Sequence, residues 1–347
     1  MISTLWLLLT RQIDTNPAQD DAALREACVQ ARYGTDTSLA REALARTRGS
    51  HNLRARYLRV LAESTAGGLG SRIDRGTGQV DTTAAWTDKW AAGFPTDPDA
   101  HLVRARSLQA RAWEVRGDGW ASTVSEQQWA EFHRLLHLAD EVNDVAMQLA
   151  PQDPTPWATR LRMHIDLGAE PDEVDDTWEE LTRRAPRHRE GHVLKMTYHC
   201  RKWRGSHEQM FGFARSAAAT ARDGSPLHLL PVRAAAEWAL WEQKRVDPQR
   251  SAEEIGELWR QDPVMQSELD TALSRWFHQP TSRQGADWLD DANFLAYGLA
   301  RTGRHAEAAP VFAAIGKYVT GVPWGWWSDT RGADHFVRAR RRARRAA

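Results

Sequence analysis

Apolar residues recur three and four positions apart along most of the chain, which is the spacing of an amphipathic helix. Gly, Pro and Asp interrupt this pattern often, so most predicted helices are only about ten to twenty-five residues long. No stretch alternates strictly enough to predict a sheet. The sequence therefore predicts an all-α fold. The predicted helices span residues 20–32, 37–47, 52–64, 81–92, 98–116, 125–150, 155–168, 171–185, 188–202, 206–222, 228–245, 252–261, 264–277, 285–302, 305–318 and 333–345.

The clearest pair of predicted helices lies at residues 292–316. Leu295 and Leu299 fall on the inner face of the first helix, and Ala308 and Phe312 fall on the inner face of the second. A small residue lets two helices approach closely, whereas a large aromatic residue fills the space where they diverge. This arrangement predicts an antiparallel helical hairpin.

A second predicted hairpin, at residues 151–186, has the same internal spacing. Leu161 and Val174 are 13 positions apart, as are the corresponding residues of the last hairpin. Ala-Pro pairs end at Pro151 and Pro186, which are 35 residues apart. Proline cannot continue the helix that precedes it, so each pair indicates the end of a hairpin.

Both hairpins resemble degenerate tetratricopeptide repeats, and the chain from about residue 20 is similar to uncharacterised bacterial helical proteins of unknown function. The resemblance implies an α-α superhelix of antiparallel helix hairpins, a tetratricopeptide-like solenoid, and it carries no catalytic residue. Proteins of this kind capture a helix or an extended segment of a partner. We therefore expect a protein–protein interaction scaffold or adaptor with a protein or peptide partner.

Glycine-rich and polar loops predict three regions along the chain. Residues 1–64 form an N-terminal helical unit, residues 81–278 form a central hairpin array, and residues 284–347 form the last hairpin with an arginine-rich tail. The run at 64–80 holds five glycines and almost no apolar residues, so we expect a flexible joint there. The loop at 279–287 separates the second region from the third.

The composition excludes some classes of function but does not identify one. Lys+Arg 46 balances Asp+Glu 46, which argues against a general nucleic-acid binder. Cys28 and Cys200 cannot make a disulfide framework, and residues 1–10 are apolar but too short to span a bilayer. We expect a soluble, cytoplasmic protein with no membrane insertion. No phosphate-binding loop, dinucleotide-binding, nucleophile-elbow or zinc-protease motif is present, so we assign neither a cofactor nor a catalytic residue.

Tryptophan is unusually frequent, with 17 residues against 5 Tyr and 8 Phe. Most tryptophans fall at core spacing, but Pro323 and Gly325 keep a regular helix from burying Trp324, Trp326 and Trp327 together. We expect these three to be the best-exposed indoles, either on a partner surface or as a lid over the last hairpin. The candidate partner-binding residues are Trp157, Trp203, Trp324, Trp326, Trp327, Arg340 and Arg341.

Two rival functions stay open. His188, His192 and His199 fall within about 40° of one another on a helix, so a helical enzyme or metal-binding protein could use that face. His199 is about 10 Å along the axis from His192, which makes a shared ion hard to form. His133 and His137 form a weaker pair, one turn apart.

The second rival is the C-terminal tail, which holds six arginines between Arg338 and Arg345. Such a cluster can contact phosphates of nucleic acid or an anionic surface. Arginine is also favoured at a helix C-terminus, so a solvated helix end is the simpler reading.

Overall fold

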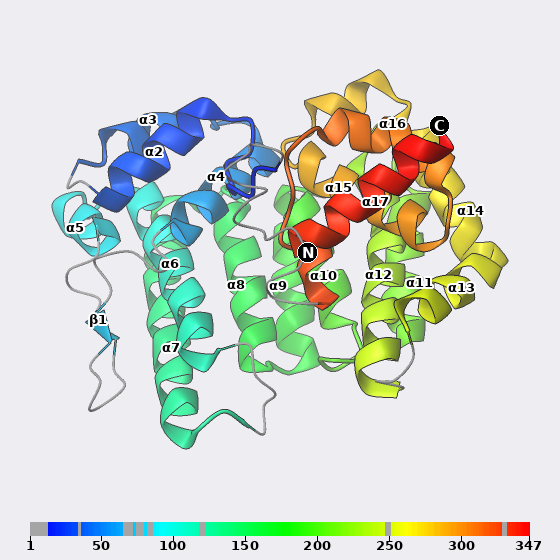
Figure 1. Ribbon diagram of the computed structural model, residues 1–347. Helices are drawn as coiled ribbons and strands as arrows, with labels where there is room; N and C mark the ends of the chain where they lie inside the picture. The colour runs from blue at the N-terminus through cyan, green and yellow to red at the C-terminus, as the bar shows by residue number, and fades with distance from the viewer. Residues whose placement is uncertain are drawn as a thin grey trace. The chain divides into compact units, whose positions relative to one another are not determined.

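The chain folds almost entirely into helices in the computed structural model (Figure 1). The structure describes residues 13–33, 36–64, 72–73, 80–81, 86–117, 123–246, 251–327 and 332–347. Within these ranges the only strands are β1 (Arg72–Ile73) and β2 (Val80–Asp81), which pair antiparallel with Ile73 opposite Val80. The predicted all-α class is confirmed for the described residues, apart from this short ribbon, which the sequence did not predict.

The helix bounds agree with the predicted ranges to within a few residues for most elements. The α-helices are α2 (Ala22–Tyr33), α3 (Ser38–Ala45), α4 (His51–Glu63), α5 (Trp86–Gly93), α6 (Pro98–Arg116), α7 (Glu126–Leu149), α8 (Thr155–Leu167), α9 (Pro171–Arg184), α10 (Arg189–Tyr198), α11 (His207–Ala219), α12 (Leu230–Trp241), α13 (Ala252–Gln261), α14 (Pro263–Ala272), α15 (Trp288–Arg301), α16 (His305–Ile315) and α17 (Gly332–Ala346). Short 3₁₀ and π elements are η2 (Pro226–Leu229), η3 (Glu242–Val246), η4 (Leu273–Phe277), η5 (Pro280–Gln284) and η6 (Trp324–Trp327).

Contacts divide the chain into two compact units. The first unit is Asp21–Leu194, and the second unit joins residues 13–20 to Lys195–Ala347. The regions predicted from the sequence, 1–64, 81–278 and 284–347, stay predictions. Residues 1–10 and most of the predicted joint at 64–80 lie outside the described residues. None of the described helices is both long enough and apolar enough to cross a membrane.

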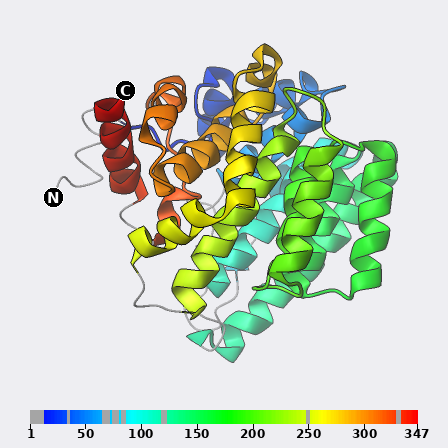
Figure 2. The same cartoon turned by 90° about the vertical axis from the view of Figure 1, so that its right-hand side faces the viewer.

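Antiparallel helices pack in succession in the first unit. Helix α6 packs on α7, α7 packs on α8, and α8 packs on α9. Helix α4 covers α6 and α8. The successive helices run alongside each other in both views (Figures 1 and 2). Their ends follow local chemistry. Ser125 and Gln128 form a capping box that begins α7, and Gly168 at φ 68 ends α8.

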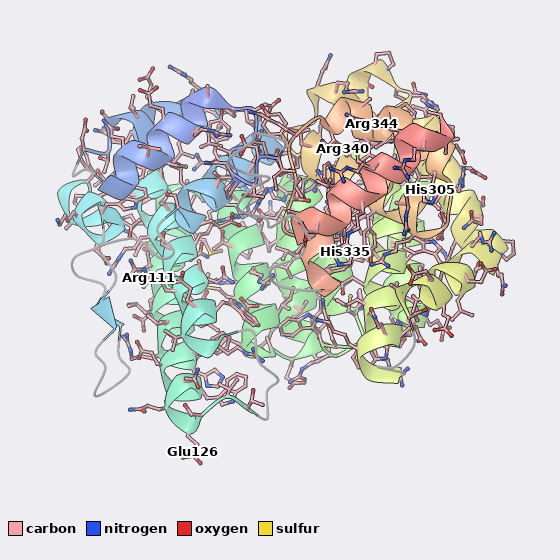
Figure 3. The ribbon with its side chains drawn as sticks, in the orientation of Figure 1. Arg111, Glu126, His305, His335, Arg340 and Arg344 are labelled. Atoms are coloured by element: carbon pink, nitrogen blue, oxygen red, sulfur yellow. The ribbon has the colours of Figure 1, made fainter. Side chains whose placement is uncertain are left out.

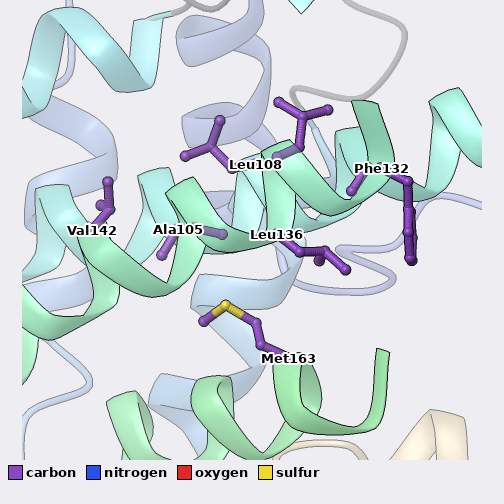
Figure 4. Close-up of a cluster of buried hydrophobic side chains, with 9 residues drawn as sticks. Ala105, Leu108, Phe132, Leu136, Val142 and Met163 are labelled. Carbon is purple, nitrogen blue, oxygen red and sulfur yellow. The ribbon is translucent and has the colours of Figure 1, made fainter. Parts of the chain in front are cut away.

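The core of the first unit combines small and large apolar side chains (Figure 4). Alanines on α6 and α7 allow a close approach of the two helices, and Phe132 fills the space toward the end of the pair. Trp113 and Trp129 meet the Phe132 ring edge-on, with centroids 5.3 Å and 5.6 Å away. The cluster consists of Ala105, Leu108, Ala112, Phe132, Leu135, Leu136, Ala139, Val142 and Met163.

The last hairpin of the second unit confirms the predicted inner faces. Leu295, Leu299 and Ala308 are completely buried between α15 and α16, and Phe312 is 1% exposed. Gly303 lies just after α15 with φ 76, a left-handed conformation that suits glycine. Helix α17 packs against α16 and completes this core.

Candidate functional site

An open cavity of about 340 Å³ lies in the first unit, on the face that α4, α6, α8 and α10 line together. Helices α6 and α8 begin the two successive hairpins α6/α7 and α8/α9, so this face belongs to the first helix of each pair. We name the cavity the arginine groove, because three guanidinium groups line it. Its polar and aromatic lining residues are Arg59, Glu63, Arg106, Gln109, Trp113, Thr159, Arg162 and Glu190.

Arg106 and Glu190 form a two-pronged ion pair at the base of the groove. The Arg106 Nη1 donates to Glu190 Oε1 at 3.0 Å, and Nη2 donates to Oε2 at 2.8 Å. The Nε of Arg106 donates to Thr159 Oγ1 at 2.9 Å. Burial by itself would raise the pKa of Glu190, but the charge and hydrogen bonds of Arg106 outweigh burial and lower the pKa to about 2. The pair is therefore ionised at neutral pH.

A second polar cluster forms around the carboxylate of Asp166. Its Oδ2 accepts hydrogen bonds from Gln109 Nε2 at 2.7 Å, from Trp113 Nε1 at 2.9 Å and from Arg162 Nε at 3.1 Å. The Arg162 guanidinium carbon also lies 5.8 Å from the centre of the Trp113 ring. These bonds fix one indole and one guanidinium against the groove in a single orientation.

The third arginine, Arg59, lies closer to the surface than Arg106. Arg59 Nη1 lies 3.9 Å from Glu63 Oε1, and the two side chains are 33% and 42% exposed. An exposed pair at this distance contributes little stability. Among the described residues that line the groove there is no cysteine, histidine or serine. The site therefore offers charged and aromatic recognition groups.

The predicted histidine face does not form a metal centre. His188 is 1% exposed, and its Nδ1 accepts a hydrogen bond from the N–H of Gly191 at 3.1 Å. His192 Nδ1 lies 3.0 Å from the carbonyl oxygen of His188, and its ring meets Trp178 edge-on. The His199 ring packs against Phe213. Within the described ranges, no group of three or more His, Cys, Asp or Glu side chains is arranged to hold a metal ion.

The second pair of histidines lies at the surface. His133 and His137 are both exposed on α7, and the His133 ring stacks on Trp129. The stacking explains the position of His133 without a ligand.

The expectation that Trp324 is exposed is wrong. Trp324 is 3% exposed, and its Nε1 donates to the Oδ1 of Asn293 at 2.8 Å. Its ring packs on Tyr297, Phe312 and Phe336, with centroids 5.3 Å to 5.9 Å away. The short η6 turn directs this indole into the last hairpin, which agrees with the alternative expectation of a lid.

The remaining candidate tryptophans are half-buried where their side chains are described. Trp326 meets Phe294 edge-on at 5.9 Å, and the Trp157 ring lies 4.5 Å under the Arg184 guanidinium. Trp203 is half-buried just after α10. The side chain of Trp327 is not among those that the structure describes.

Arg340 has a structural role that the sequence did not reveal. It is 9% exposed, its Nη1 donates to the carbonyl oxygen of Gly316 at 2.7 Å, and its guanidinium lies 5.1 Å from the Phe336 ring. Arg340 therefore ties α17 to the end of α16, and the expectation of an exposed binding residue is wrong for it. Figure 3 labels Arg340 and Arg344 on α17. The five exposed arginines of this helix are Arg338, Arg341, Arg342, Arg344 and Arg345.

Comparison of the chain with protein-family models, with curated proteins and with solved structures finds no match. The residues that build the arginine groove were not predicted from the sequence. Arg106 and Glu190 are 84 residues apart, and Gln109 and Asp166 are 57 apart. The one local feature that could have indicated the groove is the presence of charged residues on otherwise apolar faces of α6 and α8.

Proposed function

We propose that this protein is an interaction scaffold or adaptor built as a tetratricopeptide-like stack of helix hairpins. The succession of α6/α7 and α8/α9 supports the repeat interpretation, because each pair presents its first helix to the same face. The observation that carries the proposal is the arginine groove, which lies on that shared face. A partner segment would lie across α4, α6 and α8.

The chemistry of the groove favours a partner segment that carries a carboxylate beside an apolar residue. Arg59 is a guanidinium that such a carboxylate can reach, because its side chain is 33% exposed. Arg106 already forms an ion pair with Glu190, and this pair lies at the base of the groove. Trp113 offers an aromatic wall whose Nε1 is already satisfied by Asp166.

Site-specific crosslinking in extract of the native cells tests the proposal. A photoreactive residue at Ala110, inside the groove, should yield a discrete protein adduct, whereas the same residue at the exposed His137 of α7 should not. Arg59→Glu should abolish the adduct at Ala110, because it reverses the charge that a partner carboxylate meets. Arg59→Lys is the matched control and should retain most of it.

Identical adducts from Ala110 and His137, or an adduct at Ala110 that Arg59→Glu leaves unchanged, would contradict the proposal. Circular dichroism and thermal unfolding of each variant check that the fold is intact. A variant that no longer unfolds cooperatively would be replaced by Arg59→Gln, which removes the charge in the groove without reversing it.

A second candidate function is contact with an anionic surface through α17. Within the described residues, none of its five exposed arginines forms an ion pair. Replacing these five with glutamine, and keeping Arg340 so that the helix stays attached to Gly316, should abolish co-sedimentation with anionic vesicles or with duplex DNA. Equal binding by the native chain and this variant would eliminate the candidate.

A further inference from the structure

A cavity of about 180 Å³ lies in the second unit, where α17 meets the C-terminal end of α15. The start of α13, the start of α16 and the η6 turn complete its lining, and it shares no residue with the arginine groove. On α17 the lining positions are His335, Arg338, Ala339 and Arg342, which have the spacing of one helical face. One whole face of the C-terminal helix therefore borders this cavity.

Permanent positive charge dominates the lining. Arg301, at the end of α15, joins Arg338 and Arg342 of α17 around the cavity. Among the described residues that line it, Glu253 is the only carboxylate, and Glu253 is exposed in the first turn of α13. The cavity therefore has a net positive lining at neutral pH, which suits an anion.

The two arginines of α17 are available to a ligand. Arg338 and Arg342 are both exposed, and no hydrogen bond or ion pair joins either side chain to another residue that the structure describes. They are one helical turn apart and line the same cavity, so one ligand can contact both guanidinium groups. Arg340 differs, because it is buried and donates to the carbonyl oxygen of Gly316.

The charge of α17 extends across the cavity to α16. Burial lowers the pKa of His305, which is half-buried at the start of α16, and the charge of Arg342 lowers the pKa further. Arg342 is therefore close enough to His305 to affect its ionisation, although the two residues belong to different helices. An anion in the cavity would offset this positive charge.

Two buried aromatic residues supply the apolar part of the lining. Tyr297 is 1% exposed and Trp324 is 3% exposed, and their rings meet edge-on with centroids 5.4 Å apart. The guanidinium carbon of Arg301 lies 5.0 Å from the centre of the Tyr297 ring. The cavity therefore places an aromatic wall beside its arginines.

We propose that this cavity binds a phosphate group, held by the guanidinium groups of Arg338 and Arg342, with Arg301 as a third positive charge. A phosphate dianion matches more than one guanidinium, and its tetrahedral oxygens accept hydrogen bonds from several directions. A carboxylate has a single charge and two oxygens in one plane, so one arginine satisfies it. The phosphate is either the free ion or a small phosphomonoester whose organic group lies against the aromatic wall.

Isothermal titration of the full chain with inorganic phosphate, phenyl phosphate and benzoate tests the ligand class. Saturable binding of one phosphate per chain is expected at low ionic strength. Phenyl phosphate should bind more tightly than benzoate, which carries the same ring on a carboxylate. Tighter binding of phenyl phosphate than of inorganic phosphate would identify a phosphomonoester, and the reverse order would identify the free ion. These probes are soluble, so their binding is independent of the surface contact considered for α17.

A pair of double variants on α17 tests the position of the site. Arg338→Gln with Arg342→Gln should weaken phosphate binding at least about tenfold, because charge-assisted hydrogen bonds are lost. Arg341→Gln with Arg345→Gln is the matched control. It removes the same charge from two exposed arginines, also one turn apart, that are not among the lining residues, so nearly native affinity is expected.

Thermal unfolding checks that both double variants are folded. If the first does not unfold cooperatively, the single replacements of Arg338 and Arg342 are measured in its place, and each should weaken binding. No saturable binding by the native chain, binding of benzoate as tight as that of phenyl phosphate, or equal losses in the two double variants would overturn the proposal.

Discussion

Replacing Glu190 with glutamine should reveal how strongly the base of the arginine groove is held. The change keeps the volume of the side chain but removes the charge that faces Arg106, which is 8% exposed and bonded at 3.0 Å and 2.8 Å. Thr159 Oγ1 and the carbonyl oxygen of Ala55 still accept from Arg106, yet neither neutralises it. The variant therefore leaves a buried guanidinium without its counter-charge.

The expected loss in the free energy of unfolding is about 3 kcal/mol, the lower end of the range for breaking a buried pair. The pKa of Glu190 leads to a similar magnitude. A pKa that falls from 4.5 to about 2 on folding corresponds to about 3 kcal/mol of stability. Because the folded pKa is the lower one, this stability is present above pH 4.5 and disappears as the pH falls toward 2.

Urea unfolding at neutral pH and through the acid range measures both effects. The native chain and Glu190→Gln should differ by about 3 kcal/mol at neutral pH and converge as the pH falls below 4.5. Glu257→Gln is the matched control. Its pKa is also lowered by a nearby arginine, Arg260, but both side chains are exposed, so a much smaller loss is expected. Equal losses in the two variants, or no convergence in acid, would refute the reasoning.

Three further predictions follow from packing and titration. Gly256→Ala should lower the melting temperature, because the new Cβ would overlap the carbonyl oxygen of Arg301. Gly212→Ala is the control: its Cβ meets nothing within 4 Å, so it should stabilise α11 by about 0.5–1 kcal/mol. Phe312→Ala should cost about 3–5 kcal/mol in thermal or urea unfolding through the cavity that it leaves. Burial lowers the pKa of His188 from 6.5 to about 4, so the free energy of unfolding should fall as the pH falls through this interval. In pH-dependent urea unfolding, His188→Asn should make that decline shallower, and an unchanged slope would contradict the prediction.

The helices could be predicted from the sequence because their signals are local. Apolar spacing, the serine before α7 and the glycine after α15 each act within a few residues. The inner faces of the last hairpin were predicted for the same reason, since Leu295 and Phe312 share one face with their immediate neighbours.

The side-chain environments could not be predicted, because they depend on residues that are distant in the sequence. Proline and glycine around Trp324 suggested exposure, but the acceptor for its indole is Asn293, 31 residues earlier. Arg340 similarly finds its acceptor 24 residues away at Gly316. The arginine groove joins four helices through pairs up to 84 residues apart, and no local periodicity encodes such pairs.

Hydrogen exchange on the complex captured at Ala110 tests the central claim most directly. If the partner lies across the arginine groove, binding should slow amide exchange in peptides from α4, α6 and α8 and leave α7 and α9 unchanged. Slowed exchange confined to other helices, with α4, α6 and α8 exchanging as in the free protein, would contradict the claim.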